Sequence, residues 1–247
     1  MKNNFRNNLP IVNLYKKSSL KSSIDTQLLY GDKFKILKKN KFWSKIKISK
    51  DGYVGYIKND KFYNFRKTNF KVSVLKARLY KGPDYRKKTK KFLPYESRLK
   101  VTLKKGKFAK LNKYWIKISD IKKIQFKNKN IFKDVMFFKN IKYLWGGKSF
   151  QGIDCSALVQ IFFNYNNKFC PRDSKDQEKY FKKKVKLKNI KKNDIIFWKG
   201  HVAIALSRYK LIHAYGPMKK VVIMNIKYTI ERIKRTANLD ITSIRRF

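Results

Sequence analysis

The sequence predicts an α+β protein in which two small all-β units precede a unit made of a helix packed on an antiparallel sheet. Upstream of residue 126, short runs of alternating apolar residues are separated by turn signals, the pattern of closely spaced strands. Downstream, an uninterrupted apolar segment begins at Cys155 and strand-like segments begin at Asp194. Because 247 residues are enough for three small domains, we divide the chain into residues 1–62, 63–125 and 126–247.

The two N-terminal units are each predicted to be a small barrel. Asp51-Gly52 separates two alternating runs, 46–48 and 53–57, and this dipeptide is a strong signal for a β-hairpin. Two stretches also resemble each other: residues 28–37 lead to 42–46, and residues 97–103 lead to 106–111. About sixty residues with closely spaced strands fit a small barrel in each case.

The third unit combines a buried helix with a sheet. The residues that follow Cys155, as far as Tyr165, are apolar almost all round, which predicts a helix buried on most of its sides. Strands are predicted at 194–199, 201–206 and 210–214. A helix packed on such an antiparallel sheet is an α+β arrangement.

Cys155 and the two histidines are the candidate catalytic residues. Cys155 follows a glycine-punctuated loop and starts the predicted helix, where unpaired N–H groups and the helix dipole stabilise a thiolate. His201 opens a predicted strand, and His213 lies in the next one; the chain has no other histidine. Taken singly, a buried cysteine is more often a small hydrophobic residue, and a strand histidine is more often part of a core. Together they match a nucleophile, a base and a group that orients the base.

The spacing of the histidines constrains the hairpin that connects their strands. A loop with an even number of residues places His213 opposite Ile204, so that the two imidazoles point to opposite faces. A three- or five-residue loop, or a bulge, places His213 opposite Ala203 and puts both imidazoles on one face. We therefore predict an irregular hairpin with both rings and the Cys155 sulfur on one side of the sheet. A regular even loop would instead make His213 a core residue.

The C-terminal half resembles the NlpC/P60 family of cell-wall cysteine peptidases, over about residues 126 to 247. The matching segments are Trp145-Gly-Gly, Gly152-Ile-Asp-Cys-Ser, Pro171-Arg-Asp-Ser with Gln177, Asn193-Asp-Ile-Ile-Phe-Trp, and Ile244-Arg-Arg. Ala157 departs from the glycine that is usual in the family. The N-terminal units resemble the bacterial SH3 domains found in one branch of the family, and Asp51-Gly-Tyr-Val-Gly-Tyr-Ile is the better match. The resemblance implies a papain-like domain preceded by two SH3-like barrels.

The resemblance also implies a reaction and a set of site residues. Family members cut cell-wall (murein) peptides between γ-D-glutamyl and the following diamino acid, and members with such SH3 domains typically need a free N-terminal L-Ala. The implied catalytic residues are Cys155, His201 and His213, and the motif matches imply substrate binding by Asp154, Ser156, Ser174, Arg172 and Tyr53. Asp154, Ser156 and Ser174 would hold the substrate ammonium, Tyr53 would reach across from the first SH3-like unit, and Arg172 would steer carboxylates. The simpler roles are a helix N-cap for Asp154, a polar loop residue for Ser174 and barrel core for Tyr53.

The net charge of +49 leaves a second interpretation open. Sixty-four Lys and Arg against fifteen Asp and Glu would suggest a nucleic acid partner, but the basic residues are scattered from end to end. They occur with abundant Asn, Ile, Phe and Tyr, as AT-rich coding produces. No nucleic-acid-binding motif is present, so specific nucleic acid binding is not expected. A basic nucleic-acid-associated protein and a non-catalytic wall-binding module remain alternatives.

Other partners and the location are expectations from absent signals. Two cysteines and two histidines do not predict a zinc site, so we expect no metal and no cofactor, and Cys170 is expected to be a reduced structural thiol. No apolar run is long enough to span a membrane. No secretory signal is visible at the N-terminus, which favours a cytoplasmic protein over a periplasmic or wall-associated one. We expect a monomer that acts on a murein peptide.

Overall fold

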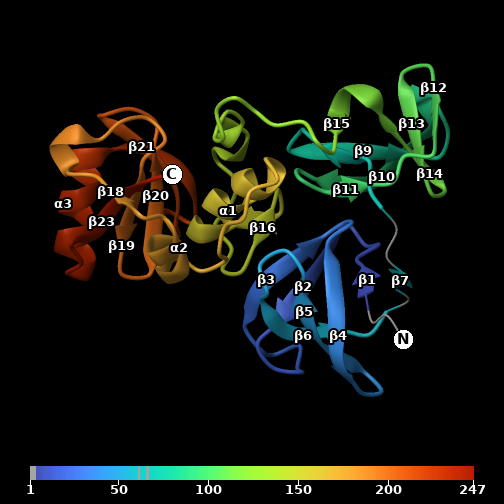
Figure 1. Ribbon diagram of the computed structural model, residues 1–247, viewed down its shortest axis with the longest axis horizontal. Coiled ribbons are helices and arrows are strands. Elements are labelled where there is room, and N and C mark those ends of the chain that lie inside the picture. The colour runs from blue at the N-terminus through green and yellow to red at the C-terminus, as the bar shows by residue number, and fades with distance from the viewer. Residues whose placement is uncertain (1–3, 61, 65–66) are drawn as a thin grey trace. The chain divides into compact units, whose positions relative to one another are not determined.

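The computed structural model describes residues 4–60, 62–64 and 67–247. The chain forms two compact units, residues 1–127 and 128–247. The N-terminal unit is rich in strands, and the C-terminal unit combines a sheet with three α-helices (Figure 1).

The first part of the N-terminal unit is a seven-stranded sheet with the order β3-β2-β6-β5-β4-β1-β7. Its strands are β1 (Asn4–Arg6), β2 (Ile11–Tyr15), β3 (Ile24–Leu29), β4 (Lys33–Lys39), β5 (Trp43–Ile48), β6 (Val54–Lys58) and β7 (Tyr63–Asn64). β5 and β6 pair as a hairpin around Asp51 and Gly52, so this predicted hairpin is confirmed. Gly52 has φ +78°, a conformation in which glycine avoids the strain of a Cβ.

The second part of this unit contains a five-stranded sheet, β10-β9-β14-β13-β12, and a three-stranded sheet, β11-β8-β15. Their strands are β8 (Phe70–Val72), β9 (Lys76–Tyr80), β10 (Lys88–Pro94), β11 (Arg98–Leu99), β12 (Leu103–Lys105), β13 (Phe108–Leu111), β14 (Tyr114–Lys117) and β15 (Ile121–Lys123). Strand pairing within the described residues leaves all of these sheets open, so the predicted strand-rich units are present without a closed barrel. The predicted boundary between 62 and 63 stays a prediction.

Buried charges join the two parts of the N-terminal unit. The ammonium of Lys50, in the turn after β5, lies 2.9 Å from Asp32 and 2.6 Å from Glu96. Arg98 also contacts Glu96, whose side chain is fully buried. Two cations stabilise the buried carboxylate of Glu96, and the cluster therefore links Asp32 and Lys50 in the first part of the unit to Glu96 and Arg98 in the second.

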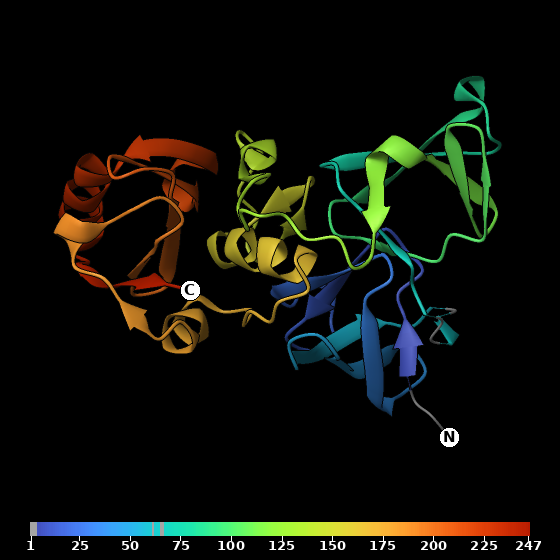
Figure 2. The ribbon, with the colours of Figure 1, turned by 45° about the horizontal axis from the view of Figure 1, so that its top comes forward.

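The C-terminal unit is a six-stranded sheet with the order β18-β23-β19-β20-β21-β22. Figure 2 shows helix α1 on one side of this sheet and helix α3 on the other. Its elements are β16 (Lys148–Ser149), β17 (Gly152–Ile153), α1 (Cys155–Tyr165), α2 (Ser174–Tyr180), β18 (Lys183–Lys184), β19 (Ile195–Trp198), β20 (His201–Ala205), β21 (Lys210–Tyr215), β22 (Lys220–Asn225), α3 (Ile226–Ala237) and β23 (Ile241–Arg246). Short 3₁₀ turns lie at 85–87, 118–120, 135–138, 187–189 and 216–218.

Helix α1 has the bounds that its apolar run predicts. Asp154 is its N-cap and accepts a hydrogen bond from the amide of Ala157, and all eleven helical residues are buried. Among the segments that the sequence analysis left unassigned are α2, β22, α3 and β23. Strand β23 pairs with β18 and β19, and its Arg246 also donates to the buried carboxylate of Asp194 at 2.6 and 2.7 Å.

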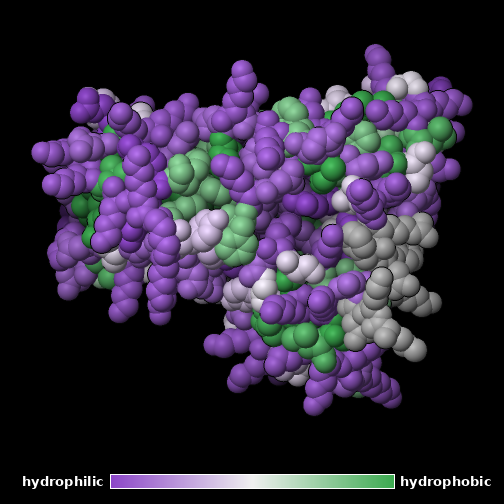
Figure 3. All heavy atoms as spheres, in the orientation of Figure 1, coloured by the Kyte–Doolittle hydropathy of each residue, from purple (hydrophilic) through white to green (hydrophobic). Residues whose placement is uncertain are grey.

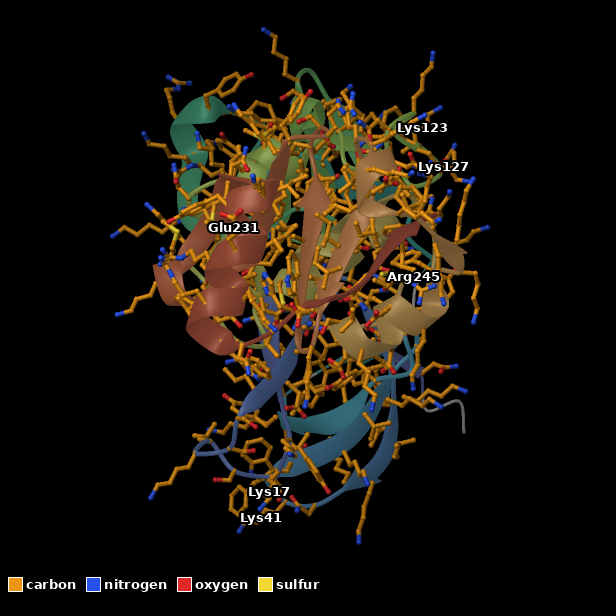
Figure 4. All side chains as sticks on the ribbon, turned by 90° about the vertical axis from the view of Figure 1, so that its left-hand side faces the viewer. Lys17, Lys41, Lys123, Lys127, Glu231 and Arg245 are labelled. Atoms are coloured by element: carbon orange, nitrogen blue, oxygen red, sulfur yellow. The ribbon has the colours of Figure 1, made fainter. Side chains whose placement is uncertain are left out.

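Exposed lysines occur in both units. Figure 3 shows hydrophilic residues over most of the face drawn, and in Figure 4 Lys17, Lys41, Lys123 and Lys127 of the N-terminal unit lie at its outside. In the described part of the chain, no helix is both long and apolar enough to cross a membrane.

Candidate active site

Cys155 lies at the first position of α1, with 8% of its surface exposed. A tight hairpin, β16–β17, leads into it, and the motif glycines make this hairpin possible. A Cβ on Gly147 would lie 2.5 Å from the carbonyl oxygen of Gly152, and a Cβ on Gly152 would lie 2.5 Å from Leu144. The glycine-punctuated loop therefore lets the backbone turn closely enough to end at the helix N-terminus.

The carboxylate of Asp154 is the centre of a buried polar cluster. It accepts hydrogen bonds from the amides of Gly146 and Ala157 and from the hydroxyl of Ser156. Arg172 donates to both carboxylate oxygens, at 3.0 and 2.5 Å, and also to the Ser156 hydroxyl at 2.8 Å. Every lone-pair direction of Asp154 thus has a donor, which is the condition under which a buried ion pair is stable.

The histidines meet across an irregular hairpin. Ile204 pairs with Ile212 and Ala205 with Leu211, a register that continues to His213 opposite Ala203. The Nε2 atom of His201 lies 2.9 Å from the Nδ1 atom of His213. The predicted odd-numbered loop and the shared face of the two imidazoles are therefore confirmed. The prediction that the sulfur lies on the same side of the sheet stays a prediction.

The ladder between β20 and β21 stops before it reaches the start of β20. Ile204 and Ala205 pair with β21, whereas Val202, which would face Ala214 in the same register, does not. Its N–H instead hydrogen-bonds to the sulfur of Cys155. The thiol thus lies at the gap where the two strands separate, beside the residue that follows His201.

Burial sets the ionisation of these groups. It raises the pKa of the Cys155 thiol to about 12, an effect that the neighbouring Asp154 carboxylate increases and that hydrogen bonds from Val202 and Ser156 only partly offset. Burial also lowers the pKa of His201 to about 4, and it lowers the pKa of His213 well below 6.5. These shifts favour a neutral thiol and a neutral imidazole over the thiolate that the helix N-terminus alone would stabilise.

Two family models match the chain. Residues 140–236 match the NlpC/P60 family, and residues 14–62 match the bacterial dipeptidyl-peptidase SH3 domain. The C-terminal unit contains an NlpC/P60 domain. Its cysteine peptidase domain holds Cys155, His201 and His213, and a bacterial SH3 domain precedes it.

Similar proteins agree with this assignment. A γ-D-glutamyl-L-lysine dipeptidyl-peptidase of Bacillus subtilis is 27% identical over 237 residues, which cover 84% of this chain and 77% of that protein. A dipeptidyl-peptidase 6 of Lysinibacillus sphaericus is 33% identical over 85 residues, which cover 34% of this chain but only 31% of that protein. An NlpC/P60 family protein from Bacillus cereus has the same fold over 99% of both chains, with a TM-score of 0.82 at 18% identity.

The other predicted binding residues of this NlpC/P60 chain occupy different settings. Ser174 is half-buried at the first turn of α2. Arg172 is 3% exposed and contacts Asp154 rather than solvent. Tyr53 belongs to the other unit, where it packs against the core of the first sheet. The substrate-binding roles of Asp154, Ser156, Ser174, Arg172 and Tyr53 stay predictions. Cys170 is a reduced, fully buried thiol.

Tyr143 is a site residue that the sequence analysis missed. It is half-buried, and its phenol lies close enough to Cys155 and Asp154 for both to raise its pKa, an effect to which burial contributes most. It therefore stays protonated and can donate a hydrogen bond. Its place two residues before Trp145, at the start of the glycine-rich motif, was the available signal.

The site offers no set of metal ligands. Across residues 4–60, 62–64 and 67–247, no three side chains of His, Cys, Asp or Glu are gathered in a way that would hold a metal ion.

Proposed function

We propose that the NlpC/P60 domain hydrolyses murein peptides at the bond between γ-D-glutamyl and the diamino acid, and that the substrate carries a free N-terminal L-Ala. The observation that carries the proposal is the Cys155 thiol at the N-terminus of α1, close to the backbone N–H of the residue that follows His201, together with the Nε2 of His201 held 2.9 Å from the Nδ1 of His213. The names of the Bacillus subtilis and Lysinibacillus sphaericus relatives, both dipeptidyl-peptidases, support the substrate class.

The neutral resting pair defines the first step. Because the Nε2 of His201 is occupied by His213, its Nδ1 is the nitrogen that takes the thiol proton as the sulfur attacks the γ-carbonyl carbon. The backbone N–H of Cys155, at the helix N-terminus, is the proposed donor to the oxyanion, and the Tyr143 hydroxyl is the proposed second donor. His201 then protonates the leaving amine, and water cleaves the resulting thioester to regenerate the thiol.

The free amine of the substrate is assigned to the polar cluster around Asp154. Both carboxylate oxygens of Asp154 already accept from Arg172 and from backbone amides, so the hydroxyl oxygen of Ser156 is the proposed contact of the ammonium, and Asp154 acts through its nearby charge. In this assignment Arg172 positions Asp154 and does not steer substrate. A cytoplasmic location and a monomeric state also stay proposals.

The test is incubation with L-Ala-γ-D-Glu-L-Lys and with the diaminopimelate analogue, followed by mass spectrometry. We expect release of the dipeptide L-Ala-γ-D-Glu and the free diamino acid. The N-acetylated peptides should be cut slower by orders of magnitude, since they present no ammonium to the polar cluster around Asp154. Equal rates on free and acetylated peptides would remove the requirement for a free amine, and no cleavage of any peptide would contradict the proposed function.

A further inference from the structure

The imidazole of His213 has a second polar neighbour besides His201. Its Nδ1 faces the Nε2 of His201 at 2.9 Å, and its own Nε2 lies 3.3 Å from the Sδ atom of Met224. The ring is fully buried and stacks on Tyr215, with centroids 4.6 Å apart and planes at 10°. Stacking of this kind holds the ring plane, so that each nitrogen points at one partner.

Strand pairing explains why Met224 reaches this position. On β22, Val222 pairs with His213 and Met224 pairs with Leu211, so Met224 is the diagonal neighbour of His213 on the same face of the sheet. The imidazole of His201 approaches from the other neighbouring strand. The three side chains form a row across β20, β21 and β22.

The chemistry of the thioether decides where the protons are. A thioether sulfur carries lone pairs and no hydrogen, so it accepts a hydrogen bond and never donates one. A neutral imidazole has one N–H and one acceptor nitrogen. If the N–H of His213 points at the sulfur, its Nδ1 is an acceptor, and the proton between the two histidines belongs to the Nε2 of His201.

We propose that Met224 is a positioning residue that fixes the tautomers of both histidines, so that His201 presents a bare Nδ1 to the Cys155 thiol. The inference rests on the proposed roles of Cys155 and His201. In the opposite arrangement, His213 carries its proton on Nδ1 and donates to His201. The proton of His201 then sits on its Nδ1, where it blocks transfer from the thiol.

Histidine tautomers can be read directly, and the chain is well suited to this because it contains two histidines. The probe is a ¹⁵N-labelled sample of the unaltered full chain near neutral pH, where both rings are neutral because burial lowers their pKa values. Two-bond ¹H–¹⁵N correlations distinguish the Nε2–H from the Nδ1–H form. We expect both histidines in the Nε2–H form, and an Nδ1–H form of His213 would overturn the proposal without any variant.

Variants of Met224 separate hydrogen bonding from packing. Met224→Leu keeps an apolar side chain of similar volume and removes the acceptor, whereas Met224→Gln places a carbonyl oxygen near the position of the sulfur. We expect the Leu variant to populate the Nδ1–H form of His213 and to lose about three- to tenfold in kcat with unchanged KM, the size of one lost hydrogen bond. The Gln variant should restore both the tautomer and kcat.

The matched control is Met136→Leu, at an exposed methionine, which should change neither measurement. Identical tautomers in the Leu variant and the unaltered protein, or identical behaviour of the Leu and Gln variants, would overturn the proposal in favour of packing alone. The tautomer measurement needs no turnover. A failure of the proposed hydrolysis would therefore appear as uncut peptide, while the spectra still report on Met224.

Discussion

The two halves of the site differ in how burial affects the charge of their side chains. Around Asp154, at the helix side, a carboxylate and a guanidinium are both buried and satisfy each other together with two backbone amides. Around His201, at the sheet side, burial removes charge, and both imidazoles are neutral. The comparison teaches that the buried Asp154 carboxylate can keep its charge because a cation and several other donors surround it. The two imidazoles contact each other and the Met224 thioether, and burial lowers both of their pKa values.

The largest effect expected from this comparison concerns the two cysteines. Replacing Cys155 with Ala should abolish hydrolysis with little loss of stability, because one small thiol at a helix terminus is removed. Cys170→Ala should keep most of the activity, since that thiol is fully buried and is not a proposed catalytic group. Peptide cleavage followed by mass spectrometry measures both. A live Cys155→Ala protein with a dead Cys170→Ala protein would reverse the assignment of the nucleophile.

The ion pair between Arg172 and Asp154 is tested by removing its cation and keeping its carboxylate. Arg172→Met leaves the buried carboxylate of Asp154 without its cation and should cost about 3–5 kcal/mol in the free energy of unfolding, measured by urea titration. The matched control is Lys234→Met, which breaks the exposed pair between Lys234 and Asp240 and should cost less than about 1 kcal/mol. Equal losses of unfolding free energy in the two variants would show that burial does not make the Asp154–Arg172 pair more important for stability than an exposed pair.

The lowered pKa values of His201 and His213 predict that the protein loses stability in acid. The pKa of His201 is about 4 in the folded protein and about 6.5 when unfolded, so the unfolded chain binds the extra proton between these values. Stability should therefore fall as the pH drops from about 6.5 to about 4, by about 3 kcal/mol from His201, with His213 acting in the same direction. Urea titrations at a series of pH values measure this. In the variant His201→Asn the fall should be smaller, and an unchanged fall would assign it to other groups.

The smallest effect expected is at Tyr143, which lies close to Cys155 and to Asp154. Tyr143→Phe removes a protonated phenol and leaves the ring, so kcat should fall about tenfold while the thermal midpoint stays near that of the unaltered protein. Tyr209→Phe, at an exposed tyrosine of the β20–β21 loop, is the control. A Tyr143→Phe enzyme with full kcat would remove the phenol from the reaction.

The sequence by itself determined the elements whose pattern is local. The apolar run after Cys155 set the bounds of α1, because a helix buried on all sides needs no information about which face points inward. The Asp51-Gly52 turn determined the hairpin of β5 and β6. The spacing of His201 and His213, combined with the alternation of side chains along a strand, required the odd-numbered loop that the structure has.

Other elements were not assigned from the sequence. Helix α3 buries Ile226, Thr229 and Ile233 among many exposed charged residues, an amphipathic pattern that the sequence analysis did not use. Strand β23 pairs with β19, and its Arg246 contacts Asp194, fifty-two residues earlier in the chain. The sequence alone does not indicate that Arg246 and Asp194 come into contact.

The tertiary structure alone decided the electrostatics of the site. The helix N-terminus predicted a thiolate at Cys155, whereas burial, which depends on everything packed around the sulfur, raises the pKa of that thiol to about 12. The contacts of Arg172 with Asp154 and of Met224 with His213 likewise join separate segments. The sequence thus determined which chemical groups are present and which faces the strand residues share. Their protonation and partners were decided by desolvation and by contacts across the sheet, which arise only when the chain is folded.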